Sequence, residues 1–144
     1  MKCNRGGFSL IELLVVVLII TILATIVGVR VLPELGKAKT AKAQAQISNF
    51  CTGLKLYQVD SGRLPTREQG LAALCVKPTA EPVPQKYREG GYLESTTVPL
   101  DPWGREYVYL VPGSEGKPYE IVCYGADGEP GGEGEDADLS SLSP

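Results

Sequence analysis

One carboxylate lies inside a long apolar segment near the N-terminus. A short basic leader, Met1 to Gly7, runs into a segment that is almost wholly apolar from Phe8 to Val29, and Glu12 is its only charged residue. A charge at the centre of a bilayer costs about 2.5–3.5 kcal/mol on insertion scales, so an intramembrane carboxylate indicates a functional site. The next basic residue is Arg30, and Glu12 therefore needs a partner from outside the segment.

Two structural roles are alternatives to a functional Glu12. Ser9 and Glu12 have the S-x-x-E spacing of a capping box, in which both side chains accept hydrogen bonds from backbone amides at a helix start. The other is a position at headgroup depth, where a charge costs little.

The apolar segment has nearly the roughly 20 residues that span a bilayer. It predicts a transmembrane helix over residues 8–30 that follows a leader over residues 1–7. A conventional secretory signal is the alternative, because Ala24-Thr25 imitates a cleavage site, although such signals have a shorter apolar core. Basic residues flank both ends of the segment, so the positive-inside rule does not orient it.

The helical pattern continues beyond the apolar segment, and residues 31–61 predict the soluble half of one long helix. Its apolar face repeats every three or four residues. That face consists of Ile47, Phe50, Cys51, Leu54 and Tyr57. Gly28 and Pro33 interrupt the middle, which predicts a kink or a melted stretch between Val29 and Gly36.

Residues 62–144 predict a small domain that covers this apolar face, so the expected fold class is α+β. Thr66 to Leu74 predicts a short helix. Tyr107–Leu110 and Tyr119–Tyr124 are rich in β-forming residues and flank a turn, which predicts an antiparallel pair. A weaker strand is expected around Gly91–Leu93. We expect one face of the sheet to pack on the helix.

Composition argues against an enzyme and against nucleic-acid binding. The 144 residues include no His, which removes the commonest general base and metal ligand. No G-x-S-x-G, P-loop or C-x-x-C pattern occurs. The net charge is −3, and losing Lys2 and Arg5 with the leader would make it −5, so the chain lacks the electrostatic footprint of a nucleic-acid binder.

The cysteines leave two interpretations open. Cys3 would leave with the leader, and Cys51, Cys75 and Cys123 would remain. One disulfide could form among these three in an oxidising compartment, but the sequence does not choose the pair. Buried free thiols that pack as small hydrophobic groups are the alternative.

An acidic, Gly-rich segment lies close to the C-terminus. Six carboxylates occur there with no basic residue between them: Asp127, Glu129, Glu133, Glu135, Asp136 and Asp138. Because like charges repel, a solvated and disordered tail is one interpretation. A Ca²⁺ site is the other, since Ca²⁺ takes carboxylate and carbonyl oxygens. An EF-hand is not expected, because the segment follows a strand and has Asp where that loop ends in Glu.

The segment Gly7-Phe8-Ser9-Leu10-Ile11-Glu12 resembles the processing site of type IV pilins and type II secretion pseudopilins. The resemblance implies that a prepilin peptidase cuts after Gly7 and that Phe8 becomes a methylated N-terminus. It also implies a partner for Glu12, namely the N-terminal amine of Phe8 in a neighbouring subunit during assembly. Removing one partner of such a buried pair is strongly destabilising.

Further segments are similar to the major pseudopilin of type II secretion systems, in the same order over nearly the whole chain. They are Ser61-Gly62-Arg63-Leu64-Pro65-Thr66, Glu68-Gln69-Gly70-Leu71, Gly90-Gly91-Tyr92-Leu93, Asp101-Pro102-Trp103-Gly104 and Gly125-Ala126-Asp127-Gly128. The resemblance implies a type IV pilin-like fold and a homopolymer, the periplasmic pseudopilus, which helps to export proteins across the outer membrane. Minor pseudopilins and an inner-membrane secretion platform are its implied partners.

The resemblance also implies a location and a cation. The subunit is expected in the cell inner membrane as a single-pass protein, surrounded by lipid before assembly, with a cytoplasmic N-terminus and a periplasmic C-terminal domain. Calcium is expected in the acidic segment, held by the carbonyl of Tyr124 and the side chains of Asp127, Asp136 and Asp138. Glu133 and Glu135 are further candidates.

Two other functions compete with this one. The first is a type IV pilus or DNA-uptake pilin, against which the Asp-Pro-Trp-Gly and Gly-Ala-Asp-Gly segments argue, as does the lack of a cysteine pair around a C-terminal loop. The second is a membrane-tethered calcium-binding module that never polymerises.

Overall fold

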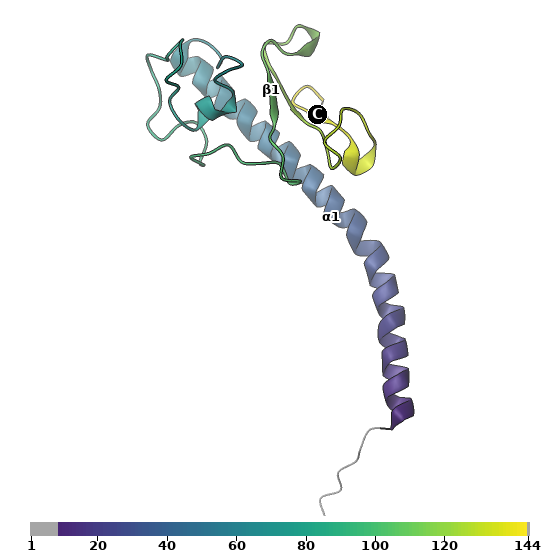
Figure 1. Ribbon diagram of the computed structural model, residues 1–144. Coiled ribbons are helices and arrows are strands. Elements are labelled where there is room, and N and C mark those ends of the chain that lie inside the picture. The colour runs from purple at the N-terminus through teal and green to yellow at the C-terminus, as the bar shows by residue number, and fades with distance from the viewer. Residues whose placement is uncertain (1–8, 144) are drawn as a thin grey trace, which may run out of the picture. The chain divides into compact units, whose positions relative to one another are not determined.

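The structure is a computed structural model that describes residues 9–143, without the side chains of residues 26–33. Its elements in chain order are α1 (Leu10–Ser61), η1 (Leu71–Leu74), β1 (Val108–Leu110), η2 (Ser114–Gly116), β2 (Glu120–Cys123), η3 (Gly134–Asp136) and β3 (Leu139–Ser140), as Figure 1 shows. The chain forms two compact units, residues 1–36 and residues 37–144.

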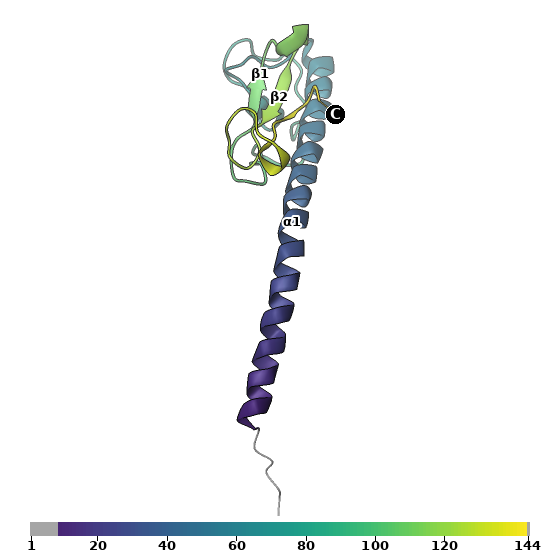
Figure 2. The same cartoon turned by 90° about the vertical axis from the view of Figure 1, so that its right-hand side faces the viewer.

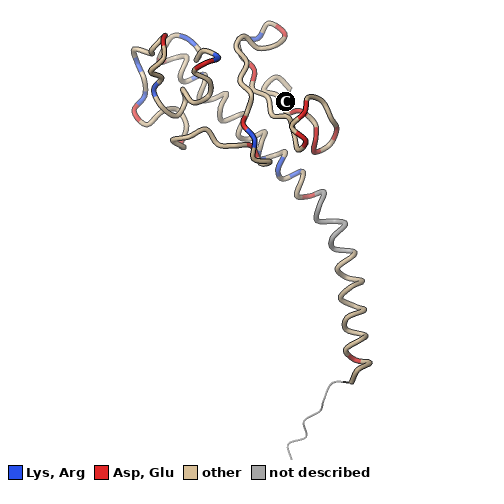
Figure 3. Tube along the Cα trace, viewed as in Figure 1, with Lys and Arg blue, Asp and Glu red and all other residues tan. Residues whose placement is uncertain are grey.

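In the first unit, α1 exposes apolar side chains around its whole circumference. Every Leu, Ile and Val from Leu10 to Leu23 is exposed, from 44% at Val15 to 84% at Leu10. Figure 3 shows this stretch as uncharged except for one acidic position near its start. A helix that is apolar all round needs lipid or other apolar surfaces about it.

The predicted membrane span, residues 8–30, includes residues whose side chains are not described. Within the described residues, no helix has an apolar stretch long enough to cross a bilayer. The helix α1 is continuous from Leu10 to Ser61, so the melted stretch predicted between Val29 and Gly36 is wrong. One proline removes a single hydrogen bond, and the flanking turns of this long helix maintain the helical path. The kink stays a prediction.

In the second unit, the later turns of α1 supply one side of the hydrophobic core. Their buried residues recur at spacings of four and three, and each is at most 4% exposed. They are Ala43, Ile47, Phe50, Leu54 and Tyr57. This confirms the predicted apolar face, except that Cys51 lies at its edge and is half-buried.

The sheet lies along this face of α1 (Figures 1 and 2). Its order is β1-β2-β3 and both pairs are antiparallel, with Tyr109 opposite Ile121. The predicted strand pair is therefore confirmed, whereas β3 was not predicted. Phe50 meets Tyr107, the residue before β1, edge to face with ring centroids 5.0 Å apart. Tyr109 and Ile121 of the strands belong to the same buried core cluster as Phe50, so the sheet packs on the helix as expected.

The connection from α1 to the sheet is a series of turns, and the helix predicted from Thr66 to Leu74 is present only as η1. Thr66 and Gln69 form a reciprocal capping box, in which each side chain accepts the other's backbone amide at 3.2 and 3.1 Å. The amide group of Gln69 also donates to the carbonyl of Ala80 at 2.9 Å, which fixes the proline-rich loop that follows.

The strand predicted around Gly91–Leu93 is wrong. Gly91 has a φ of +82°, a left-handed conformation that an ordinary strand residue does not adopt. This bend lets the amide of Tyr92 donate to the carbonyl of Leu74 at 2.7 Å. A Cβ atom on Gly91 would lie 2.7 Å from the carbonyl oxygens of Leu74 and Cys75, so the turn has no room for a side chain.

Candidate functional site

Glu12 lies in the first turn of α1 and its side chain is exposed. The backbone amides of Glu12 and Leu13 donate to the carbonyl of Ser9 at 3.0 and 3.2 Å. The described contacts of residues 9–143 include no hydrogen bond between the Ser9 hydroxyl and the Glu12 amide, so they do not form the capping box considered above. They include no ion pair of Glu12 either. The carboxylate is therefore available to a partner outside the described chain.

Two threonines farther along the same helix are satisfied internally. The hydroxyl of Thr21 donates to the carbonyls of Val17 and Leu18 at 3.0 and 2.8 Å, and that of Thr25 donates to Thr21 at 2.8 Å. Glu12 is thus the one ionisable side chain that the described helix surface from Leu10 to Thr25 presents. The predicted processing residues Gly7 and Phe8 lie outside the described residues.

The acidic segment forms a folded loop between β2 and β3. The amide of Gly128 donates to the carbonyl of Tyr124, and the amide of Ala126 donates to that of Glu135, both at 2.9 Å. The loop closes tightly, since a Cβ atom on Gly125 or Gly132 would lie 2.6 Å from the carbonyl oxygen of Asp136. These contacts replace the disordered tail that was one interpretation of the sequence.

The candidate calcium ligands all lie in this loop, but their side chains do not converge. Asp127 accepts the amide of Glu129 at 3.0 Å, and Asp138 accepts the amide of Gly131 at 2.9 Å. Within the part of the chain that the structure describes, no three carboxylates or thiols come together as a metal site. The donor set nevertheless fits a hard cation in kind, because it consists only of oxygens.

An arginine outside the loop binds its backbone, a contact that was not predicted from the sequence. The guanidinium of Arg105 donates to the carbonyls of Gly125, Ala126 and Asp127 at 3.2, 2.8 and 2.9 Å. The available signal was its position directly after Asp-Pro-Trp-Gly, a segment that Asp101 folds into a turn.

Asp101 is buried, with 6% of its surface exposed, and organises that turn from its first position. One carboxylate oxygen accepts the amides of Trp103 and Arg105 at 2.9 and 2.8 Å. The other accepts the thiol of Cys123 at 3.3 Å. Burial and this hydrogen bond raise the pKa of Cys123 to about 12, so the thiol stays protonated and does not act as a nucleophile.

The three cysteines of the second unit are free, with Cys75 and Cys123 buried and Cys51 half-buried. Burial raises the pKa of Cys75 as well. Of the two interpretations of the cysteines, the structure therefore has free thiols that pack in or beside the core.

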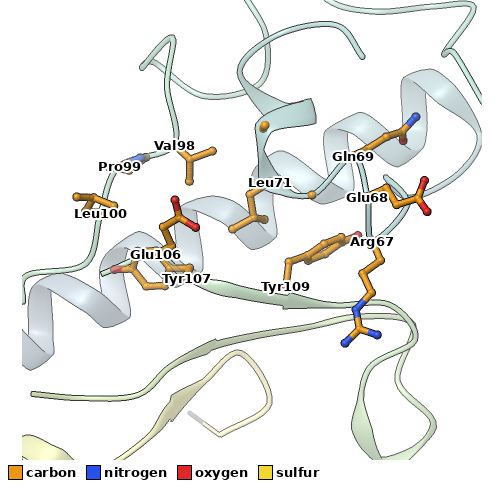
Figure 4. Close-up of a pocket in the computed structure, with 12 residues that line it drawn as sticks. Arg67, Glu68, Gln69, Leu71, Val98, Pro99, Leu100, Glu106, Tyr107 and Tyr109 are labelled. Atoms are coloured by element: carbon orange, nitrogen blue, oxygen red, sulfur yellow. The ribbon is translucent and has the colours of Figure 1, made fainter. Parts of the chain in front are cut away.

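A cavity of about 370 Å³ opens beside β1, with Leu71, Val98 and Tyr109 among its lining residues (Figure 4). Its charged side chains, Glu106 among them, are exposed. The phenol of Tyr109 donates to the carbonyl of Pro65 at 3.1 Å. No serine, cysteine or histidine lines the cavity, so it offers no nucleophile and base pair.

Comparison with protein families gives two matches along the chain. The family described as "Type II secretion system (T2SS), protein G" matches residues 30–142. The prokaryotic N-terminal methylation motif matches residues 2–28. Together the two matches extend over nearly the whole sequence.

Individual proteins agree with these matches. The type II secretion system core protein G of Pseudomonas aeruginosa is 41% identical over 138 residues, covering 96% of this chain and 95% of that protein. The protein of the same description in Vibrio cholerae is 44% identical, with 96% and 92% covered. A crystal structure of the major pseudopilin from the type 2 secretion system of enterohaemorrhagic Escherichia coli matches with a TM-score of 0.63 at 37% identity, covering 75% of this chain and 90% of that one.

Proposed function

This chain belongs to the type II secretion system protein G family, and we propose that it serves there as the major pseudopilin, a structural subunit and not an enzyme. Copies of the chain polymerise into a periplasmic pseudopilus, whose growth helps to move exported proteins across the outer membrane. The observation that carries this function is the apolar helix surface from Leu10 to Leu23, which is exposed in the single chain and contains one carboxylate at Glu12.

Assembly follows from the chemistry of that surface. A prepilin peptidase cuts after Gly7, Phe8 is methylated, and its amine pairs with Glu12 of a neighbouring subunit. Within a low-dielectric bundle an ion pair is far more favourable than an isolated carboxylate, so the pair sets the register between subunits. Minor pseudopilins and the inner-membrane platform act in the same assembly.

The same surface supports a location before assembly. The apolar stretch is surrounded by lipid of the cell inner membrane in a single pass, with the N-terminus in the cytoplasm and residues 37–144 in the periplasm. The match to the N-terminal methylation motif over residues 2–28 supports this arrangement, because the motif belongs to the segment that is processed there.

Replacing Glu12 tests the assembly function. We expect Glu12→Gln to be processed and inserted like the wild type but to form few filaments, because the neighbour's amine then lacks its counter-charge. Glu12→Asp, which keeps the charge, should recover part of the assembly. Thr21→Val, a change of nearly equal volume in the same helix, is the control. Filaments are measured by shearing and microscopy, and wild-type filament yield from Glu12→Gln would refute the proposal in favour of a simple anchor.

The acidic loop supports a second part of the proposed function, the binding of Ca²⁺. The carbonyl of Tyr124 and the side chains of Asp127, Asp136 and Asp138 would hold the ion, with Glu133 and Glu135 as further candidates. A bound cation would neutralise like charges that otherwise repel, and by mass action it would stabilise the folded chain, provided that it binds the folded loop more tightly than the unfolded chain.

A melting experiment tests the calcium site. The full chain in detergent should melt at a lower temperature in excess chelator than in excess CaCl₂. MgCl₂ at the same concentration is the control for ionic strength, since Mg²⁺ keeps its waters and demands stricter geometry. Identical melting curves in chelator and in calcium would remove the ion from the proposed function while leaving the filament function intact.

A further inference from the structure

Arg105 is the only basic side chain with described contacts to the acidic loop among residues 9–143. Its two terminal nitrogens reach three successive carbonyls, those of Gly125, Ala126 and Asp127. Three successive carbonyls that point to one group require a turned backbone, and an ionised donor makes each of these hydrogen bonds stronger than a neutral one.

The base of this arginine is fixed to the core. Asp101 accepts the amide of Arg105, and the amide of Asp101 in turn donates to the carbonyl of Arg105 at 2.8 Å. The same carboxylate accepts the thiol of Cys123, which is 1% exposed at the end of β2. The position of Arg105 is therefore set by the buried end of the sheet and not by the loop that it contacts.

The loop fits the guanidinium closely. A Cβ atom on Gly128 would clash with the side chain of Arg105, which would have to shift from its present position against the loop. Gly128 also has a φ of +75°, which favours glycine for a second reason. The backbone held by Arg105 continues into the rest of the loop, because Ala126 donates to the carbonyl of Glu135.

We propose that Arg105 is a positioning residue of the acidic loop, which holds residues 125–128 in their turned conformation before a cation binds. Two effects on cation affinity then oppose each other. The positive charge repels a cation, but the guanidinium is exposed and salt screens it. Fixing the backbone in advance removes an entropy cost that binding would otherwise carry. The saving in entropy outweighs the screened charge repulsion, so Arg105 raises the affinity of the loop for Ca²⁺.

The first test needs no cation. Hydrogen exchange of the full chain in detergent and excess chelator is measured for wild type, Arg105→Ala, Arg105→Lys and the control Arg67→Ala, an exposed arginine elsewhere in the unit. Peptides from residues 124–138 should exchange about tenfold faster in Arg105→Ala, and faster in Arg105→Lys too, because an ammonium lacks the planar fork of donors. Peptides from residues 43–57 should not change. Wild-type exchange of the loop in Arg105→Ala would overturn the proposal.

The second test separates positioning from charge, and it rests on the proposed calcium site. Calorimetric titration with CaCl₂ should give an affinity at least about fivefold weaker in both Arg105 variants, since the binding-competent conformation is less populated. Tighter binding by Arg105→Ala, with wild-type binding by Arg105→Lys, would mean that only charge matters and would overturn the effect on affinity. If wild type binds no calcium, the calcium site fails, and the exchange experiment alone decides the role of Arg105.

Discussion

The phenol of Tyr107 donates a hydrogen bond to the side-chain carbonyl of Gln46 at 2.7 Å, which joins the residue before β1 to α1. The ring of Tyr107 also meets Phe50 edge to face, one helical turn beyond Gln46. Burial raises the pKa of this phenol, so it stays a donor over the whole physiological range. Helix and sheet are thus joined by both an apolar and a polar contact of one residue.

Removing the hydroxyl tests the polar contact. Tyr107→Phe should lower the free energy of unfolding by about 0.5–1.5 kcal/mol, the usual net value of one hydrogen bond, because the ring contact remains. Denaturant unfolding of the full chain in detergent measures this loss. A loss above about 3 kcal/mol would contradict it, since that cost implies a disturbed core.

Truncating the ring partner should cost more. Phe50 is 1% exposed, and Phe50→Ala should destabilise the second unit by about 3–5 kcal/mol through lost burial and the cavity left behind. Val59→Ala is the matched control, because Val59 belongs to the same helix and is 80% exposed. The same unfolding measurement should find the control within about 0.5 kcal/mol of wild type.

A pair of glycines separates backbone conformation from crowding. Gly91 and Gly62 have φ values of +82° and +76°. A Cβ atom on Gly91 would lie 2.7 Å from two carbonyl oxygens, whereas one on Gly62 would have no neighbour within 4 Å. Gly62→Ala should therefore cost about 1–2 kcal/mol for the left-handed conformation alone. Gly91→Ala should cost clearly more, measured as the difference between the two unfolding free energies. Equal losses would show that the turn at Gly91 can relax.

Glu120 gives the second unit a dependence on pH. Hydrogen bonds from Ser114, and then from Ser140, lower the pKa of its carboxyl below the usual value of 4.5. Because the folded-state pKa is the lower one, this stabilisation is present above about pH 4.5 and is lost as the pH falls through the folded-state pKa. Glu120→Gln should therefore be less stable than wild type by about 1–3 kcal/mol at pH 7, and the difference should shrink in acid.

Unfolding curves at pH 3 to 7 measure that difference. Glu94→Gln is the control, since Glu94 is exposed. A difference between Glu120→Gln and wild type that stays constant over this range would show that the amide loses packing and not charge.

The thiols should differ in reactivity. In processed protein at pH 8, an alkylating reagent should modify half-buried Cys51 before Cys75 and Cys123, because burial raises the pKa of both buried thiols and blocks access. Peptide mass spectrometry measures the order. Early modification of Cys123 would mean that its contact with Asp101 opens readily.

Periodic features of this chain were predictable from its residues. The apolar face of α1 follows from spacing alone, and the β1 and β2 pair follows from two β-rich runs around a turn. The prediction of a strand near Gly91 was wrong because the pattern of apolar residues does not indicate which residue has a positive φ. The strand β3 has two residues, Leu139 and Ser140, which is too short for any period.

The candidate site was predictable in kind but not in detail. Glu12 and the acidic loop could be predicted as candidate sites from the sequence, because it contains one acid within an apolar run and six acids within a glycine-rich run. Arg105 was missed because its contacts lie at least 20 residues away in sequence and go to backbone carbonyls, which have no residue identity to recognise.

The hydroxyls of Thr21 and Thr25 each donate to a carbonyl of their own helix, so neither needs a polar partner in its surroundings. In the proposed assembly, this stretch would pass from lipid to neighbouring subunits without exchanging a hydrogen bond at either threonine. Glu12 would then be the one ionisable side chain between Leu10 and Thr25 whose polar contacts change on assembly.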